Sequence, residues 1–66
     1  MKWTAKIDGD KVVIEGQGAE ESGAIIEVQP SGLVYLYEIP QYGGFPIADD
    51  TYNSLIEAMK RAESWT

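Results

Sequence analysis

The chain has 66 residues, a formal net charge of −6, and neither cysteine nor histidine. A chain this short makes one domain, residues 1–66, and a domain of this size buries only about 60% of its unfolded surface. Without thiols or imidazoles it lacks disulfides, the usual zinc and haem ligands, and the commonest catalytic bases and nucleophiles. We therefore expect a non-enzymatic protein without metal or cofactor, for which oligomerisation is the main remaining way to bury more surface.

The distribution of charge is more informative than its sum. No lysine or arginine lies between Val12 and Met59. Direct binding of nucleic acid or of an anionic membrane needs basic residues, so neither is expected. The acidic span is either a solvated surface or a negative field that attracts a basic partner. Its carboxylates are Glu15, Glu20, Glu21, Glu27, Glu38, Asp49, Asp50 and Glu57.

The cellular location follows from what the sequence lacks. No stretch approaches the roughly 18 consecutive apolar residues of a membrane span. The N-terminus also lacks the apolar core of a signal peptide. A cytoplasmic protein is the expected result.

The first predicted element is a hairpin. Residues 3–7 and 11–15 each alternate apolar and polar side chains, which is the pattern of half-buried strands. A two-residue turn at Gly9-Asp10 pairs Asp8 with Lys11. A turn one residue earlier would place two lysines opposite each other, which costs stability. We therefore expect the first register, with the glycine in the positive-φ position of a type II′ turn.

The loop that follows carries glycines without a ligand-binding motif. Residues 16–23 contain three glycines and two glutamates, a composition typical of a flexible connector. The glycine spacing does not match a phosphate-binding loop. Asp8-Gly9-Asp10 starts like a calcium loop, but Val12 stands where an oxygen ligand is needed, so only weak calcium binding is left open.

A second hairpin is predicted around Pro30. Proline and Gly32 favour a three-residue turn with a bulge at the glycine. This turn pairs Val28 with Val34, whereas a tighter two-residue turn would change which side chains share a face. The expected register gives one face with Ala24, Ile26, Val28, Val34 and Leu36, and another with Ile25, Glu27, Leu33, Tyr35, Tyr37 and Ile39.

The last predicted element is a helix that begins at Asp49-Asp50-Thr51, with an aspartate as its N-cap. The fold class is then α+β: a two-layer, four-stranded antiparallel sheet of two hairpins, meander-like, with one C-terminal helix on one face (ββββα). The expected core consists of Ala5, Ile7, Val12, Ile14, Ile26, Val28, Val34 and Leu36 from the sheet, and Tyr52, Leu55, Ile56 and Met59 from the C-terminal segment.

The aromatic residues carry the functional signal. One helix cannot cover both faces of the sheet, and aromatic side chains are common at the centres of interfaces. They are either ordinary packing residues or a contact surface. The functional hypothesis is a small protein–protein interaction module that forms a homodimer through the second apolar sheet face. Its predicted partner-binding residues are Ile25, Leu33, Tyr35, Tyr37, Ile39, Tyr42 and Phe45.

Two alternatives remain open from the sequence. The acidic span also fits a decoy that inhibits a basic nucleic-acid-binding protein by placing carboxylates where phosphates would lie, as small phage or mobile-element proteins do. The Tyr42–Phe45 loop, flanked by prolines and containing two glycines, is the candidate for a peptide or small-molecule pocket.

Overall fold

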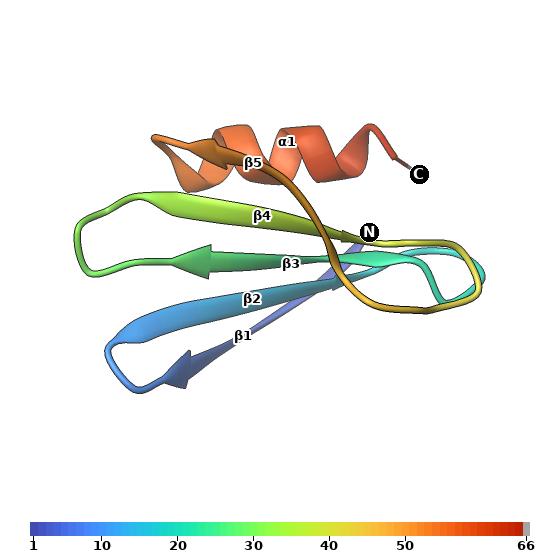
Figure 1. Ribbon diagram of the computed structural model, residues 1–66, viewed down its shortest axis with the longest axis horizontal. Coiled ribbons are helices and arrows are strands. Elements are labelled where there is room, and N and C mark those ends of the chain that lie inside the picture. The colour runs from blue at the N-terminus through green and yellow to red at the C-terminus, as the bar shows by residue number, and fades with distance from the viewer. Residues whose placement is uncertain (66) are drawn as a thin grey trace.

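The computed structural model describes residues 1–65. It is an α+β fold in which five antiparallel strands follow one another in chain order and one C-terminal helix lies against the sheet (Figure 1). The predicted class and meander are confirmed, with one more strand than expected. The elements are β1 (Lys2–Asp8), β2 (Lys11–Gln17), β3 (Gly23–Val28), β4 (Val34–Ile39), β5 (Ile47–Tyr52) and α1 (Leu55–Glu63).

Both hairpins have the predicted registers. Asp8 pairs with Lys11, and the intervening glycine has a φ of 66°. Val28 pairs with Val34, and Gly32, with a φ of 94°, donates its N–H to the Gln29 carbonyl at 2.8 Å. The turn residues therefore determine both registers, because each glycine occupies a position that side chains disfavour.

The predicted start of the helix was wrong. Asp49, Asp50 and Thr51 lie in β5, and Thr51 pairs with Tyr35 of β4. A bulge between Leu36 and Tyr37 shifts the register of this pair of strands. The segment is more stable as a strand than as a helical turn, because its backbone forms hydrogen bonds with the N–H and C=O groups along the free side of β4.

The helix begins at Leu55, after Ser54. The Ser54 hydroxyl accepts the Glu57 N–H at 3.2 Å, and its own backbone is extended, which is the geometry of an N-cap. Only nine residues are helical, so α1 is about 14 Å long. In this position α1 packs on β3, β4 and β5.

The core lies between α1 and the three strands beneath it. Ala58 and Ala62 are the buried helix residues, and their small side chains allow the helix to approach the sheet closely. Ile26, Val34 and Leu36 are the largest fully buried side chains. The remaining buried members are Ile14 and Ala24, and Met1, Trp3, Val28, Tyr52, Leu55, Met59 and Trp65 pack against them while partly exposed.

Four residues predicted for the core are exposed. Ile7 is 80%, Val12 38% and Ile56 66% exposed, and Ala5 is also on the surface. The helix packs on β3, β4 and β5 rather than on β1 and β2, so Ala5, Ile7 and Val12 have no layer above them, while Ile56 lies on the exposed side of α1 (Figure 1). The opposite end of β1 is covered, because Trp3 packs on the core and donates its indole N–H to Glu63 at 2.9 Å.

Candidate protein interface

The sheet face opposite α1 is called the helix-free face below. The strand registers place on it Lys2, Thr4, Lys6, Asp8, Lys11, Val13, Glu15, Ile25, Glu27, Leu33, Tyr35, Tyr37 and Ile39. Five of the predicted partner-binding residues therefore come together here as the register required. Their side chains are half-buried although no helix lies over them.

The two tyrosines of the helix-free face lie on β4, next to β3. Tyr37 lies opposite Ile25, and Tyr35 lies opposite Glu27. A tyrosine next to a β-branched residue on adjacent strands is a favourable cross-strand pair. Beside the tyrosines, at the bulge between β4 and β5, is an open hollow of ≈ 230 Å³. It is lined by Tyr35, Leu36, Tyr37, Ala48, Asp49, Asp50 and Thr51.

A polar network adjoins these tyrosines. Glu27 accepts the Lys11 ammonium at 3.1 Å and the Tyr37 hydroxyl at 3.4 Å. The hydrogen bond to Glu27, followed by the charge of that carboxylate, raises the pKa of Lys11. Burial, followed by the Glu27 charge, raises the pKa of Tyr37. The Tyr37 hydroxyl thus keeps its proton at neutral pH. The side chain gives the helix-free face both an apolar ring and a hydrogen-bonding hydroxyl.

Val13 is a member of this face that the sequence analysis missed. It is only 7% exposed, although it faces away from the helix. Its neighbours in the ladder are Lys6 on β1 and Glu27 on β3. Long charged side chains cover apolar surface with their stems, which explains its burial. The signal was present in the run Val12-Val13-Ile14, where the alternation of apolar and polar residues fails.

Tyr42 and Phe45 lie in the β4–β5 loop rather than on the strands of this face. Tyr42 has a φ of 67° and donates its N–H to the Glu20 carbonyl at 2.7 Å, which joins two loops. The side chain of Gln41 also donates to the Glu20 carboxylate. Both aromatic rings are exposed, at 72% for Tyr42 and 92% for Phe45.

The described hollows do not involve those rings. A second hollow of ≈ 340 Å³ lies at the loop end of the sheet, and neither it nor the first is lined by a residue from Tyr42 to Phe45. The second hollow is lined by Glu15, Gly16, Gln17, Gly18, Glu21, Ser22, Ala24 and Ile39. The two rings are therefore exposed and lie outside both of these hollows.

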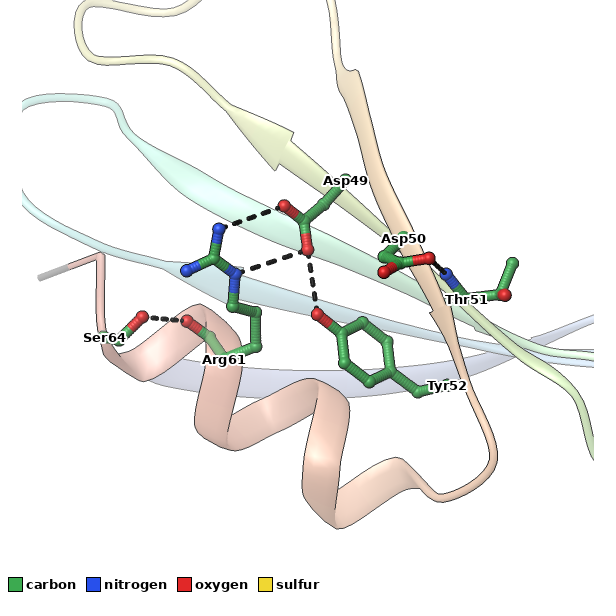
Figure 2. A network of polar contacts seen from close by, with 6 residues as sticks. All are labelled: Asp49, Asp50, Thr51, Tyr52, Arg61 and Ser64. Atoms are coloured by element: carbon green, nitrogen blue, oxygen red, sulfur yellow. Dashed lines mark hydrogen bonds and ion pairs between the residues drawn. The ribbon is translucent and has the colours of Figure 1, made fainter.

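A polar cluster joins β5 to the helix (Figure 2). Asp49 accepts the Tyr52 hydroxyl at 2.9 Å, and its second carboxylate oxygen lies 3.3 Å from Nη2 of Arg61. Burial raises the pKa of Tyr52 most, and the hydrogen bond to Asp49 adds to the shift. The hydrogen bond to Asp49 likewise raises the pKa of Arg61. Each group is paired within the fold, so the cluster serves to attach the last strand.

Searches for relatives and for a membrane segment returned nothing. Comparison with protein-family models, with curated proteins and with solved structures gave no match in any of the three. Within residues 1–65 no helix is long and apolar enough to cross a membrane. In the same part of the chain, no three His, Cys, Asp or Glu residues are grouped so that they could hold a metal ion.

Proposed function

We propose that this protein is a small, non-enzymatic interaction module that forms a homodimer through its helix-free face. The observation that carries the proposal is the position of Tyr35 and Tyr37, half-exposed beside a ≈ 230 Å³ hollow on a face that no helix covers. Rigid aromatic rings next to a hollow give an interface its anchors, because they bury much area at a small cost in side-chain entropy.

The charge on this face favours a second copy as the partner. A chain with a net charge of −6 repels its own copies at long range. The helix-free face is the exception, because all three lysines of the first two strands lie on it and balance three carboxylates. These residues are Lys2, Lys6 and Lys11, and Asp8, Glu15 and Glu27. Two copies therefore meet least repulsion when these faces approach each other.

Chain length supports the same conclusion. A single core in 66 residues supplies only about 3–5 kcal/mol of stability, and small proteins commonly add to it by oligomerisation. The half-buried side chains of Ile25, Leu33 and Ile39 become fully buried when a second sheet packs on them. Sheets packed face to face lie about 10 Å apart, which leaves room for two layers of such side chains.

The test is the molecular mass of the double variant Tyr35→Ser, Tyr37→Ser, measured by analytical ultracentrifugation. We expect it to halve the mass of the wild-type particle while the far-UV circular dichroism stays unchanged. Ile56→Ser is the matched control, because this residue is 66% exposed on the helix, away from the face. An unchanged mass in the double variant, or a wild-type monomer at high concentration, would falsify the proposal.

The acidic decoy is the second candidate. It is favoured by Glu20 and Glu21, two adjacent exposed carboxylates in a loop held by the Tyr42 N–H. Other carboxylates are less available, because Glu15, Glu27 and Asp49 form ion pairs. A decoy binds a basic nucleic-acid-binding protein tightly at low salt and weakly at high salt. Binding that does not change with salt, or that persists in the Glu20→Gln, Glu21→Gln variant, rules this candidate out.

A further inference from the structure

The outer edge of β1 is an unpaired strand edge. Within residues 1–65, β1 pairs with β2 alone and lies on the side of the sheet farthest from α1 (Figure 1). The other edge strand, β5, is interrupted by a bulge and carries two aspartates, which are the usual protections against edge-to-edge pairing. By contrast, β1 pairs regularly over seven residues and contains neither a bulge nor a proline, so its backbone edge is open to another strand whose side chains complement Lys2, Lys6 and Asp8.

The register determines which backbone groups this edge presents. In a two-residue hairpin the residues flanking the turn, here Asp8 and Lys11, exchange hydrogen bonds with each other. Backbone groups of successive residues point to opposite sides of a strand. The N–H and C=O groups of Trp3, Ala5 and Ile7 therefore point away from β2, toward the free edge.

We propose that β1 pairs antiparallel with β1 of a second copy across a two-fold axis at Ala5, which joins two five-stranded sheets into one. In this register Ala5 faces its own copy, and Trp3 faces Ile7 of the second copy. All three outward-pointing residues then form hydrogen-bonded pairs. Each copy uses the same surface, as a two-fold interface requires.

The side chains on this edge are complementary to themselves in the same register. Ile7, 80% exposed in the single chain, lies opposite the large ring of Trp3, which is half-buried. Lys2 lies opposite Asp8 of the second copy, and such opposite charges across a ladder are favourable. The pairing thus explains why an isoleucine predicted for the core lies on the surface of the single chain.

The neighbouring registers lack this complementarity. An axis at Thr4 places Lys2 opposite Lys6 of the second copy, and an axis at Lys6 places that lysine opposite itself. Like charges directly opposite each other are destabilising. An axis at Lys6 also places Trp3 opposite Gly9 of the second copy, where it has no apolar partner. Ala5 is therefore the centre that the sequence of β1 favours.

This contact uses a different surface from the helix-free face and does not rest on the proposed function. The edge axis is perpendicular to the sheet, whereas stacking of two faces uses an axis within its plane. If both contacts form and their axes intersect, the product is a tetramer with three perpendicular two-fold axes. Either contact alone gives a dimer of twice the 7.3 kDa chain mass, so failure of one leaves the other visible.

A cysteine scan along β1 tests the register. The chain has no cysteine, so every disulfide in a single-cysteine variant joins two copies through the new residue. Hydrogen-bonded partners have Cα atoms about 5.5 Å apart, within the 4.4–6.8 Å range of disulfides. We expect Ala5→Cys to cross-link under mild oxidation much faster than Thr4→Cys, Lys6→Cys or the control Ile56→Cys, which is 66% exposed on α1.

The outcomes of the scan are decisive in both directions. Fastest cross-linking at position 4 or 6 overturns the proposed register, because it places the axis at Thr4 or Lys6. A rate for Ala5→Cys equal to that for Ile56→Cys overturns the pairing of β1 edges itself. Cross-linking that is fastest at Ala5 supports the proposal whether or not the helix-free faces also stack.

Molecular mass gives an independent readout. Ala5→Pro removes an outward N–H without removing a hydrogen bond to β2, and we expect it to halve the mass of the particle. Ile7→Lys is the second variant, because an 80% exposed side chain contributes little to the fold of the single chain. Ile56→Lys is the matched control on α1. An unchanged mass in both β1 variants contradicts the proposal.

Discussion

Asp49 in β5 and Arg61 in α1 form an ion pair, with 3.3 Å between Oδ1 and Nη2, and the Tyr52 hydroxyl donates to the other oxygen of the same carboxylate (Figure 2). The Arg61 guanidinium also lies 5.6 Å from the ring centre of Trp65. These contacts connect the last strand, the helix and the C-terminal turn. The strand that the sequence did not reveal is thus attached to the element that covers the core.

Removing the shared carboxylate should loosen this connection. We expect Asp49→Ala to lower the free energy of unfolding by about 1–2 kcal/mol, because a partly buried tyrosine hydroxyl loses its acceptor. Urea denaturation measures the change. Asp50→Ala is the matched control, since the Asp50 carboxylate accepts from the N–H of the next residue and its side chain is exposed. Equal losses in the two variants would contradict the role given to Asp49.

The N-cap of α1 provides the second prediction. We expect Ser54→Ala to destabilise the protein by about 1 kcal/mol, because the Glu57 N–H loses its acceptor. Ser31→Ala is the control: its hydroxyl accepts the Leu33 N–H at the longer distance of 3.4 Å in an exposed turn, so the change in stability should be less than about 0.5 kcal/mol. Thermal unfolding followed by circular dichroism gives both values. If Asp50→Ala costs more than Ser54→Ala, the helix begins earlier than Leu55.

Two adjacent valines distinguish the two faces of β2. Val13 is 7% exposed and Val12 is 38% exposed. Val13→Ala removes two buried methyl groups and should cost about 1–2 kcal/mol. Val12→Ala should cost less in the single chain, although the sequence pattern alone favours Val12 as the core residue. The opposite order in a denaturation experiment would mean that the faces of β2 are reversed.

Alkaline pH should destabilise the fold. Burial raises the pKa of Tyr52 and of Tyr37, and Asp49 and Glu27 add to the two shifts. Above pH of about 10 the unfolded tyrosines ionise while the folded ones keep their protons. The stabilisation is therefore complete below that pH and is lost as the pH rises through the folded pKa values. The raised pKa of Lys11 acts in the same direction.

The measurement is a series of urea unfolding curves from neutral to alkaline pH. Tyr52→Phe should reduce the alkaline loss of stability, because this side chain no longer titrates. Tyr42→Phe, at a residue that is 72% exposed, is the matched control. Stability that stays constant above pH of about 10 in the wild type would show that these hydroxyls ionise equally in the folded and unfolded chains.

Local turn chemistry made both hairpins predictable. Gly9 and Gly32 occupy positive-φ positions, and each determines a register that places every neighbouring side chain on a face. The same reasoning placed Ile25, Tyr35 and Tyr37 together on one side of the sheet. A register determines on which face a side chain lies, but it does not determine what binds to that face.

The C-terminal third was less predictable because two local signals competed. Asp49, Asp50 and Thr51 are good capping residues, but they also fit an edge strand when β4 offers a free side. Ser54 is the residue that caps the helix, and this later start shortened it to nine residues. The sequence also did not reveal that α1 packs on β3, β4 and β5, which leaves Ile7 of β1 exposed.

The strand order has a consequence for the speed of folding. Each strand pairs with its neighbour in the chain, so most contacts form after closing short loops such as the two-residue turn at Gly9. Short loops cost little entropy to close, and proteins dominated by such contacts reach the native state faster than those with distant strand pairing. The exceptions are the packing of α1 on β3 and the contact of Met1 and Trp3 with Glu63, which joins the first strand to the end of the helix. During synthesis this contact forms last, after the hairpins.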